Sequence, residues 1–345
     1  MWCTRFTPQT LEELDYHPEA NELFTHMART TDLPHLLVYG PPGSGRHTRV
    51  MALIRAIYAV KTLEYVPSTI VYETASDKNE INVISTACHL ELNPSEVGAQ
   101  DVYIIQTVIR ETASTASVDN KFKIIVLQDA GKLTFVAQQA LRRLMEQHAS
   151  TCKLIFITES LSGLIPPIVS RCFCIRVPGF TTQEIIDILR NTVDDHKLMR
   201  VSDELIEDVA HQARGNLRRA FLILQSFYYA SAKRTVDISD LVPEWELRCR
   251  EIGNYCGNKN LKPEQLEKIR GVLVQILKQA IPPDLILAQL YFEFKRAAQR
   301  QGLPTLLHQI VQSYTEYDCR LVSGSNPLYH LEAFAICCIT AEAQG

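Results

Sequence analysis

The 345-residue sequence lacks long hydrophobic runs and a strong excess of charge of either sign. Its longest apolar stretches, such as 333–341, are much shorter than the about 20 residues that span a bilayer. The opening residues contain no apolar secretory segment, so we expect neither export nor a membrane partner. The net charge of −4 excludes a basic protein that coats nucleic acid and restricts any DNA contact to local basic sites.

Paired cysteine motifs with zinc spacing are also absent. The ten cysteines are scattered; Cys172 and Cys174 fall in an apolar run, and Cys337 and Cys338 are adjacent in a helical pattern. We interpret them as reduced core thiols of an intracellular protein, and we expect no metal site.

Apolar runs alternate with amphipathic helical patterns in the first half of the chain, as in parallel α/β folds. Five runs are typical of buried strands, at 36–39, 70–73, 123–127, 153–158 and 174–177. Four stretches between them have helical spacing, at 48–60, 79–90, 101–112 and 134–148. We therefore predict, over residues 1–177, a parallel sheet with helices on both faces and phosphate-binding sites at the carboxyl ends of its strands.

Helical patterns continue without strands after Pro178. Thr181 or Thr182 can cap one helix, Ser202 can cap the next, and Gly215 can end it. These signals predict a small helical domain over 178–242. Apolar residues recur at helical spacing through 243–345, which predicts an all-helical C-terminal domain.

The clearest motif is a glycine-rich segment that follows a predicted strand and opens a predicted helix: Gly40, Pro41, Pro42, Gly43, Ser44, Gly45, Arg46, His47 and Thr48. Such a loop directs backbone N–H groups at phosphate oxygens. The usual pattern has Lys and then Ser or Thr where this chain has Arg46 and His47. Arginine does not replace a compact ammonium, and imidazole is a poor magnesium ligand. Two readings remain open: a turn that binds no ligand, and a weak or inert pocket that holds ADP or ATP without hydrolysis.

The second half of an ATPase site would be an acidic pair after an apolar strand. Here Gln128 and Asp129 follow the strand at 123–127. Gln128 replaces the carboxylate that would hold magnesium, and Asp129 is shorter than the glutamate that would orient water. We predict that this site is catalytically inactive and requires no cofactor.

A rigid proline pair precedes an arginine in the segment IPPIVSRC at 165–172. Pro166 and Pro167 exclude a regular helix interior and predict an exposed turn before Arg171. An arginine on such a turn can reach the γ-phosphate held by a neighbouring subunit, as an arginine finger does. The alternative is an ordinary solvated arginine.

Five motifs occur in the order found in AAA+ clamp loaders. They are the phosphate loop, the strand before Gln128, ALRRLME at 140–146, IPPIVSRC at 165–172 and GNLRRA at 215–220. The chain resembles the small subunits of replication factor C. Three further segments, LEELDYH at 11–17, PHLLVYG at 34–40 and YHLEAF at 329–334, are most similar to the ATPase-degenerate type, called subunit 3 in animals and subunit 5 in yeasts. The resemblance implies an AAA+ module, a helical lid and a helical collar.

The resemblance also implies roles for single residues. Arg171 matches the finger that completes the adjacent ATP site in trans, and Arg218 matches the lid arginine called sensor 2. Glu159 stands where active members place an asparagine near the γ-phosphate, which a carboxylate would repel. The segment 6–8 reads FTP where the family has Tyr-Arg-Pro beside the adenine.

For DNA, the resemblance implies weak contacts. Arg142 and Arg143 match a basic pair on the helix that couples subunits around DNA. Lys78 and Asn79 would open a helix that faces DNA. Arg49 and Lys132 are weaker candidates.

The function implied is that of a non-catalytic subunit of the heteropentameric clamp loader. Its partners would be the other replication factor C subunits, the sliding clamp (proliferating cell nuclear antigen) and primer-template DNA, in replication and repair in the nucleus. A related reading places the chain in a checkpoint loader that shares these subunits. The alternative is an autonomous AAA+ ATPase with an atypical phosphate loop.

Overall fold

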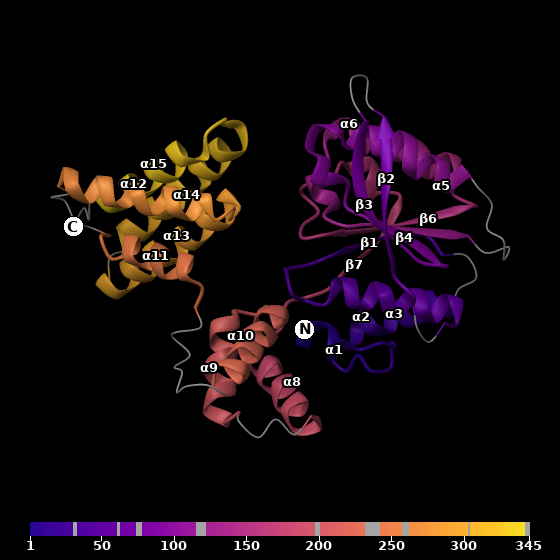
Figure 1. Ribbon diagram of the computed structural model, residues 1–345, viewed down its shortest axis with the longest axis horizontal. Helices are drawn as coiled ribbons and strands as arrows, with labels where there is room; N and C mark the ends of the chain where they lie inside the picture. The colour runs from indigo at the N-terminus through magenta and orange to yellow at the C-terminus, as the bar shows by residue number, and fades with distance from the viewer. Residues whose placement is uncertain are drawn as a thin grey trace. The chain divides into compact units, whose positions relative to one another are not determined.

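The computed structural model describes residues 1–29, 33–60, 63–73, 78–114, 122–196, 201–231, 242–256, 262–302 and 304–341. The chain forms two compact units, Met1–Ile238 and Ser239–Gly345. The first contains a sheet and helices, and the described part of the second is helical (Figure 1). The predicted domain boundaries at 177/178 and 242/243 remain predictions.

A seven-stranded sheet, ordered β2-β3-β4-β5-β6-β1-β7, forms the centre of the first unit. The last five strands in this order run parallel, while β3 is antiparallel to both β2 and β4. The predicted α/β fold class is confirmed. The sheet is mixed, and the predicted phosphate loop follows β1, which is one of its parallel strands. The strands are β1 His35–Tyr39, β2 Val66–Glu73, β3 Lys78–Ser85, β4 His89–Leu92, β5 Lys123–Leu127, β6 Cys152–Thr158 and β7 Cys172–Arg176.

The helix predicted over 79–90 is wrong, because this segment forms β3 and β4. Ile81 and Val83 alternate along β3, and each is only 2% exposed. β3 pairs with β2 over eight residues and with β4 on its other side. These two ladders, together with β-branched side chains on one buried face, favour the strand over the helix.

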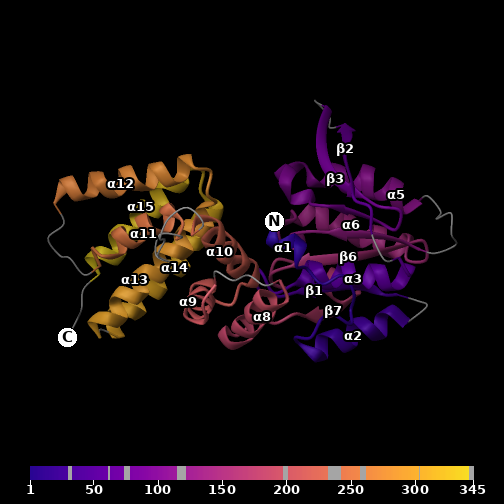
Figure 2. The same ribbon diagram turned by 60° about the horizontal axis from the view of Figure 1, so that its bottom comes forward.

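Helices cover both faces of the sheet. Figure 2 shows α2 and α3 on one side and α5 and α6 on the other. Leu36 and Val38 of β1 pack with α2 and α3, whereas Leu37, between them, packs with the opposite layer. The helices of this module are α1 Trp2–Arg5, α2 Pro18–Arg29, α3 Arg46–Tyr58, η1 Pro94–Gln100, α4 Asp101–Ile104, η2 Ile105–Ile109, α5 Arg110–Ser114, η3 Ala130–Lys132, α6 Phe135–Gln147 and α7 Pro166–Val169. The helices predicted at 48–60, 101–112 and 134–148 are confirmed.

Three further helices of the first unit begin at side-chain caps: α8 Thr182–Asp195, α9 Asp203–Ala213 and α10 Leu217–Ala230. Thr181 and Glu184 form a capping box on α8, and Ser202 caps α9, as predicted. Asn216 caps α10 by accepting a hydrogen bond from the Arg219 N–H. Gly215, with φ of 80°, follows α9 at the sharp change of direction.

The second unit contains five described helices, α11 Glu244–Gly253, α12 Pro263–Lys278, α13 Pro283–Gln301, α14 Pro304–Ser323 and α15 Pro327–Thr340. Their buried faces meet in one core that includes Ile269, Leu273, Phe294 and Phe334. Among the described helices of the whole chain, none combines the length and apolar character required to cross a membrane.

All ten cysteines are free thiols. Four are buried, namely Cys152, Cys249, Cys256 and Cys338. Burial raises the pKa of Cys152 to about 12, so its thiol is protonated at neutral pH.

Candidate functional site

The predicted phosphate loop connects β1 to α3, at the carboxyl end of a central parallel strand. Gly45 is the N-cap of α3 and has a left-handed φ of 81°. A Cβ on Gly43 would lie 2.0 Å from the Asn216 Oδ1 atom, so the cap of α10 packs directly against the loop. The loop therefore has the strand–loop–helix geometry of an anion site, with α10 adjoining it.

The buried side chain of Arg49 holds the phosphate loop in place through hydrogen bonds. It is 2% exposed and donates hydrogen bonds to the carbonyl oxygens of Ser44 (3.1 Å), Gly45 (3.5 Å) and Tyr16 (2.8 Å) and to the Asn21 Oδ1 atom (3.0 Å). In a trans peptide the N–H points opposite to the carbonyl oxygen. The N–H groups that follow Ser44 and Gly45 therefore face away from Arg49. The suggestion that Arg49 contacts DNA is wrong, because its guanidinium is enclosed.

The position of the expected magnesium-binding hydroxyl is occupied by His47, which pairs with a buried carboxylate. The His47 Nε2 atom lies 2.7 Å from Glu91 Oε1, and the Gln128 side-chain amide donates to the same oxygen. The Glu91 side chain is 4% exposed. Burial raises the pKa of Glu91, but the hydrogen bonds from His47 and Gln128 and the nearby charge of His47 outweigh it and hold the pKa below its usual value.

These residues do not fit a magnesium ion. Magnesium prefers an octahedral shell of oxygen ligands, whereas this position presents an imidazole and an amide nitrogen that both engage Glu91. Asp129 lies beside Lys132, with 3.3 Å between Oδ2 and Nζ. Within the ranges that the structure describes, no group of three or more His, Cys, Asp and Glu side chains is arranged to hold a metal.

Three other predicted pocket residues, Asp129, Glu159 and Arg218, lie close enough to Arg46 for their charges to act on it. Burial lowers the pKa of Arg46, while the charges of Glu159 and Asp129 oppose that shift and the charge of Arg218 adds to it. The Arg46 Nη1 atom is buried and has no hydrogen-bond partner among the described residues. A cavity of about 210 Å³ lies beside Asp129 and Glu159. The structure thus brings together two cations and two carboxylates from four distant segments.

The N-terminal segment is attached to helices α8 and α10. The Trp2 ring packs on Tyr228, with 5.3 Å between ring centroids, and the backbone N–H of Trp2 donates to Gln225 Oε1 at 2.8 Å. Phe6 stacks on His196 at 4.1 Å. The Phe6 ring, at the position where the family has an adenine-flanking residue, therefore already has an aromatic partner.

Arg171 follows α7, a single helical turn that begins with Pro166 and Pro167. The expected exposed turn is thus one turn of helix, because proline is tolerated at the first helical positions. The Arg171 Nε atom donates to Glu146 Oε1 at 2.9 Å, and Nη1 donates to the Pro167 carbonyl oxygen at 2.8 Å. The side chain is 34% exposed. Sequence motifs did not identify Glu146 as the partner of Arg171.

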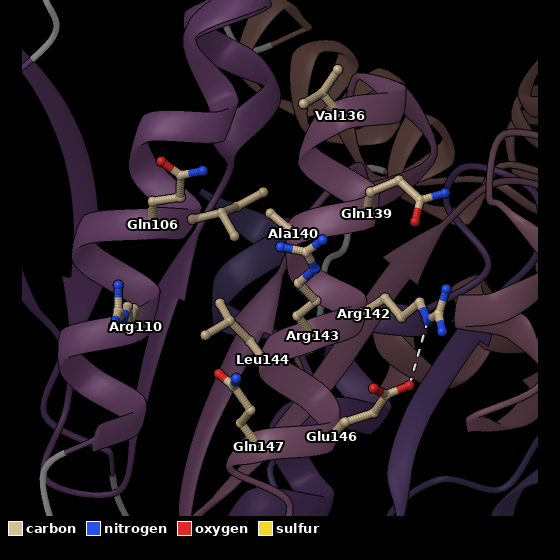
Figure 3. Close-up of a pocket in the computed structure, with 11 residues that line it drawn as sticks. Gln106, Arg110, Val136, Gln139, Ala140, Arg142, Arg143, Leu144, Glu146 and Gln147 are labelled. Atoms are coloured by element: carbon tan, nitrogen blue, oxygen red, sulfur yellow. Dashed lines mark hydrogen bonds and ion pairs between the residues drawn. The ribbon is translucent and has the colours of Figure 1, made fainter.

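A groove of about 780 Å³ runs between α6 and the helix formed by η2 and α5. Figure 3 shows Arg110 across from α6, which carries Arg142 and Arg143 pointing to different sides. Arg142 lies 3.4 Å from Glu146. Arg110 was not singled out from the sequence, since only the tertiary packing places it opposite α6. The expectation that Lys78 and Asn79 open a helix is wrong, because their backbones begin the strand β3. Their side chains lie outside the described parts.

Two family models match the chain. One, described as "Replication factor C subunit 3, C-terminal domain", matches residues 245–344. The other, described as "DNA polymerase III, delta subunit", matches residues 16–181.

Curated relatives match nearly the whole chain. The chain is similar to "Probable replication factor C subunit 3" of Dictyostelium discoideum, with 36% identity over 97% of this chain and 96% of that protein. It is 35% identical to "Replication factor C subunit 3" of Homo sapiens, over 97% of this chain and 94% of that protein. Identity to "Replication factor C subunit 5" of Saccharomyces cerevisiae is 30%, over 98% and 99% of the two chains.

Among solved structures, a RuvB variant of Thermotoga maritima superposes with a TM-score of 0.52 and 14% identity, covering 86% of this chain and 91% of that one. At this identity the similarity concerns the fold alone, which is that of AAA+ proteins. The similarity to the replication factor C relatives is 30% identity or more over almost their full length, and it therefore shows the family as well as the fold. The chain therefore belongs to the replication factor C subunit 3/5 family.

Proposed function

We propose that this chain is a non-catalytic subunit of the replication factor C clamp loader, which helps to load the sliding clamp onto primer-template DNA in replication and repair. The observation that carries the proposal is the His47–Glu91–Gln128 contact at the magnesium position. The chain would act in the nucleus within a heteropentamer. Its contribution to ATP hydrolysis would be made at the site of a neighbouring subunit.

The chain's own pocket is proposed to be inactive because each part of phosphoryl-transfer catalysis is altered. Catalysis of this kind depends on positioning and on stabilising charge at the transferred phosphoryl group. His47 offers an imidazole in place of a hydroxyl, and Gln128 offers a neutral amide in place of a carboxylate. By the family resemblance, Glu159 adds negative charge near the expected γ-phosphate. ADP or ATP can still be held without hydrolysis, through the loop N–H groups together with Arg46 and Arg218.

Steady-state ATP hydrolysis by the purified chain tests this part of the proposal. We expect no phosphate release above background, because His47, Gln128 and Asp129 replace the residues that would hold magnesium and orient water. Asp129→Ala should leave that background unchanged. Steady hydrolysis that Asp129→Ala abolishes would contradict the proposal and favour an autonomous ATPase with an atypical phosphate loop.

Arg171 is proposed as the finger that completes the neighbouring ATP site in trans. Its position supports this role, since its partly exposed side chain follows a short helix that begins with two prolines. A guanidinium on a rigid support is suited to a developing phosphoryl charge.

Arg171→Ala in the assembled complex tests the finger. With the ATP sites of the other subunits inactivated, hydrolysis at the neighbouring site should fall by at least about 100-fold, since fingers of this kind contribute about 10³- to 10⁵-fold. Arg190→Ala is the matched control, because Arg190 is also partly exposed and ion-paired, with Asp203 at 3.1 Å. Full hydrolysis by the assembled Arg171→Ala complex would rule out the finger.

DNA contact is proposed at the groove beside α6. Arg110, Arg142 and Arg143 line it, and Glu146 is the single carboxylate among its lining residues. This local excess of positive charge suits a phosphate backbone, although the whole chain has a net charge of −4. Lys78 and Asn79, which begin β3 rather than a helix, stay predictions for the same partner.

A further inference from the structure

Glu146 binds the same guanidinium that is proposed to act in trans. Its Oε1 atom accepts from Arg171 Nε at 2.9 Å and lies 2.6 Å from Arg171 Nη2. The two residues come from different elements, since Glu146 is in the last turn of α6 and Arg171 follows α7. α6 and α7 are in direct contact. The ion pair therefore connects α6, which lines the basic groove (the groove that carries Arg110, Arg142 and Arg143), with Arg171, the proposed arginine finger.

A second contact fixes the other side of the guanidinium. Arg171 Nη1 donates to the Pro167 carbonyl oxygen at 2.8 Å, and Pro167 lies in the first turn of α7. A guanidinium has five N–H donors. Glu146 and Pro167 engage at most three of them, so at least one donor on Nη1 and one on Nη2 remain for an external acceptor. Two donors are the number that a bidentate contact with a phosphate uses.

The local charge is still suited to a phosphate. Arg142 lies 3.4 Å from Glu146, so the group contains two guanidiniums and one carboxylate and has a net charge of +1. The hydrogen bond from Arg171 holds the pKa of Glu146 below its usual value, and the carboxyl is therefore ionised at neutral pH. Glu146 thus restricts Arg171 without cancelling the positive charge.

We infer that Glu146 is a positioning residue, which, together with the Pro167 carbonyl, preorganises Arg171 for the triphosphate of a neighbouring subunit. The inference rests on the proposed trans-acting role of Arg171 and adds a second residue to it. Without Glu146, the long side chain of Arg171 would sample more rotamers and would have to be ordered in each catalytic cycle. The cost should appear in the chemical step rather than in the affinity for ATP.

The test compares Glu146→Ala, Glu146→Gln and Arg171→Ala in the assembled complex, with hydrolysis restricted to the neighbouring site. We expect Glu146→Ala to lower kcat by about 10-fold with KM for ATP unchanged, because misplacement of a catalytic group is costly. Glu146→Gln keeps an acceptor oxygen and should recover part of the loss. Glu207→Ala is the matched control, because Glu207 is likewise exposed and lies 3.6 Å from an arginine, Arg190.

The outcomes separate the two proposals. If Arg171→Ala impairs hydrolysis but Glu146→Ala has wild-type or higher kcat, the positioning role is wrong and the finger stands. If Arg171→Ala has no effect, the finger itself is wrong. A change in KM alone, or an equal effect of Glu207→Ala, would also overturn the inference. Equal thermal unfolding of the free variants and equal assembly would exclude a structural cause.

Discussion

Among the described residues, Arg49 has the largest fully buried side chain, and its four hydrogen-bond partners include no carboxylate. Burying a cation is costly unless its donors are satisfied. Here oxygens from the N-terminal segment and from the phosphate loop satisfy them. Burial lowers the pKa of Arg49 to about 10, so the side chain remains charged at neutral pH. The loop conformation is therefore supported by this protein's own cation.

Replacing Arg49 should destabilise the first unit. Arg49→Met removes a donor from all four oxygens. It leaves the Ser44 carbonyl and Asn21 Oδ1 with no donor among the described residues, since the Gly45 and Tyr16 carbonyls still accept from the residue 49 backbone N–H and the Asn21 amide. We expect a loss of about 3 kcal/mol in the free energy of unfolding. Arg49→Lys keeps a charged ammonium group with three N–H donors, so the free energy of unfolding should fall by less. Urea denaturation of the full chain measures both. Arg190→Met, at an exposed arginine, should change stability by less than about 0.5 kcal/mol. A similarly small effect of Arg49→Met would contradict this account of the loop.

The strands β1, β5, β6 and β7 were predictable because each is a short apolar run between turn signals. β3 was not, because Ile81, Ile84 and Cys88 have helical spacing in the sequence while Ile81 and Val83 alternate as in a strand. Periodicity alone cannot separate these patterns. Pairing with β2 and β4 decides between them, and such long-range pairing is not visible in the local sequence.

The residues of the candidate site that follow predicted parallel strands could be predicted from the sequence, whereas the contacts that depend on tertiary packing could not. The rule that loops meet at the carboxyl ends of parallel strands places Arg46, Asp129 and Glu159 together, and the charges around Arg46 agree. Glu91 was missed because it lies on β4, a strand that was not predicted and whose first two residues fall in the helix wrongly assigned to 79–90. The Arg171–Glu146 pair was missed because it depends on the packing of α6 against α7, which no motif describes.

On the scale of the whole molecule, the candidate chemistry and the C-terminal helices belong to separate cores. The phosphate loop, Arg171 and the basic groove all lie in the first unit. The second unit has its own buried core, in which aromatic rings meet around Phe334. Phe334 is fully buried and lies 6.0 Å from Phe294, 6.4 Å from Tyr314 and 6.1 Å from Tyr317, measured between ring centroids.

Phe334→Ala should therefore destabilise the second unit by about 3–5 kcal/mol, through lost burial and the cavity that remains. Hydrogen exchange of the full chain measures the effect, and protection should fall in α11 to α15 while β1, β5 and β6 keep theirs. Tyr329→Ala, on the same helix but at a side chain that is 60% exposed, is the matched control and should leave exchange unchanged. Equal loss of protection in the sheet would mean that the two units unfold as one cooperative structure, since separate cores otherwise confine the effect of a cavity to the unit that contains it.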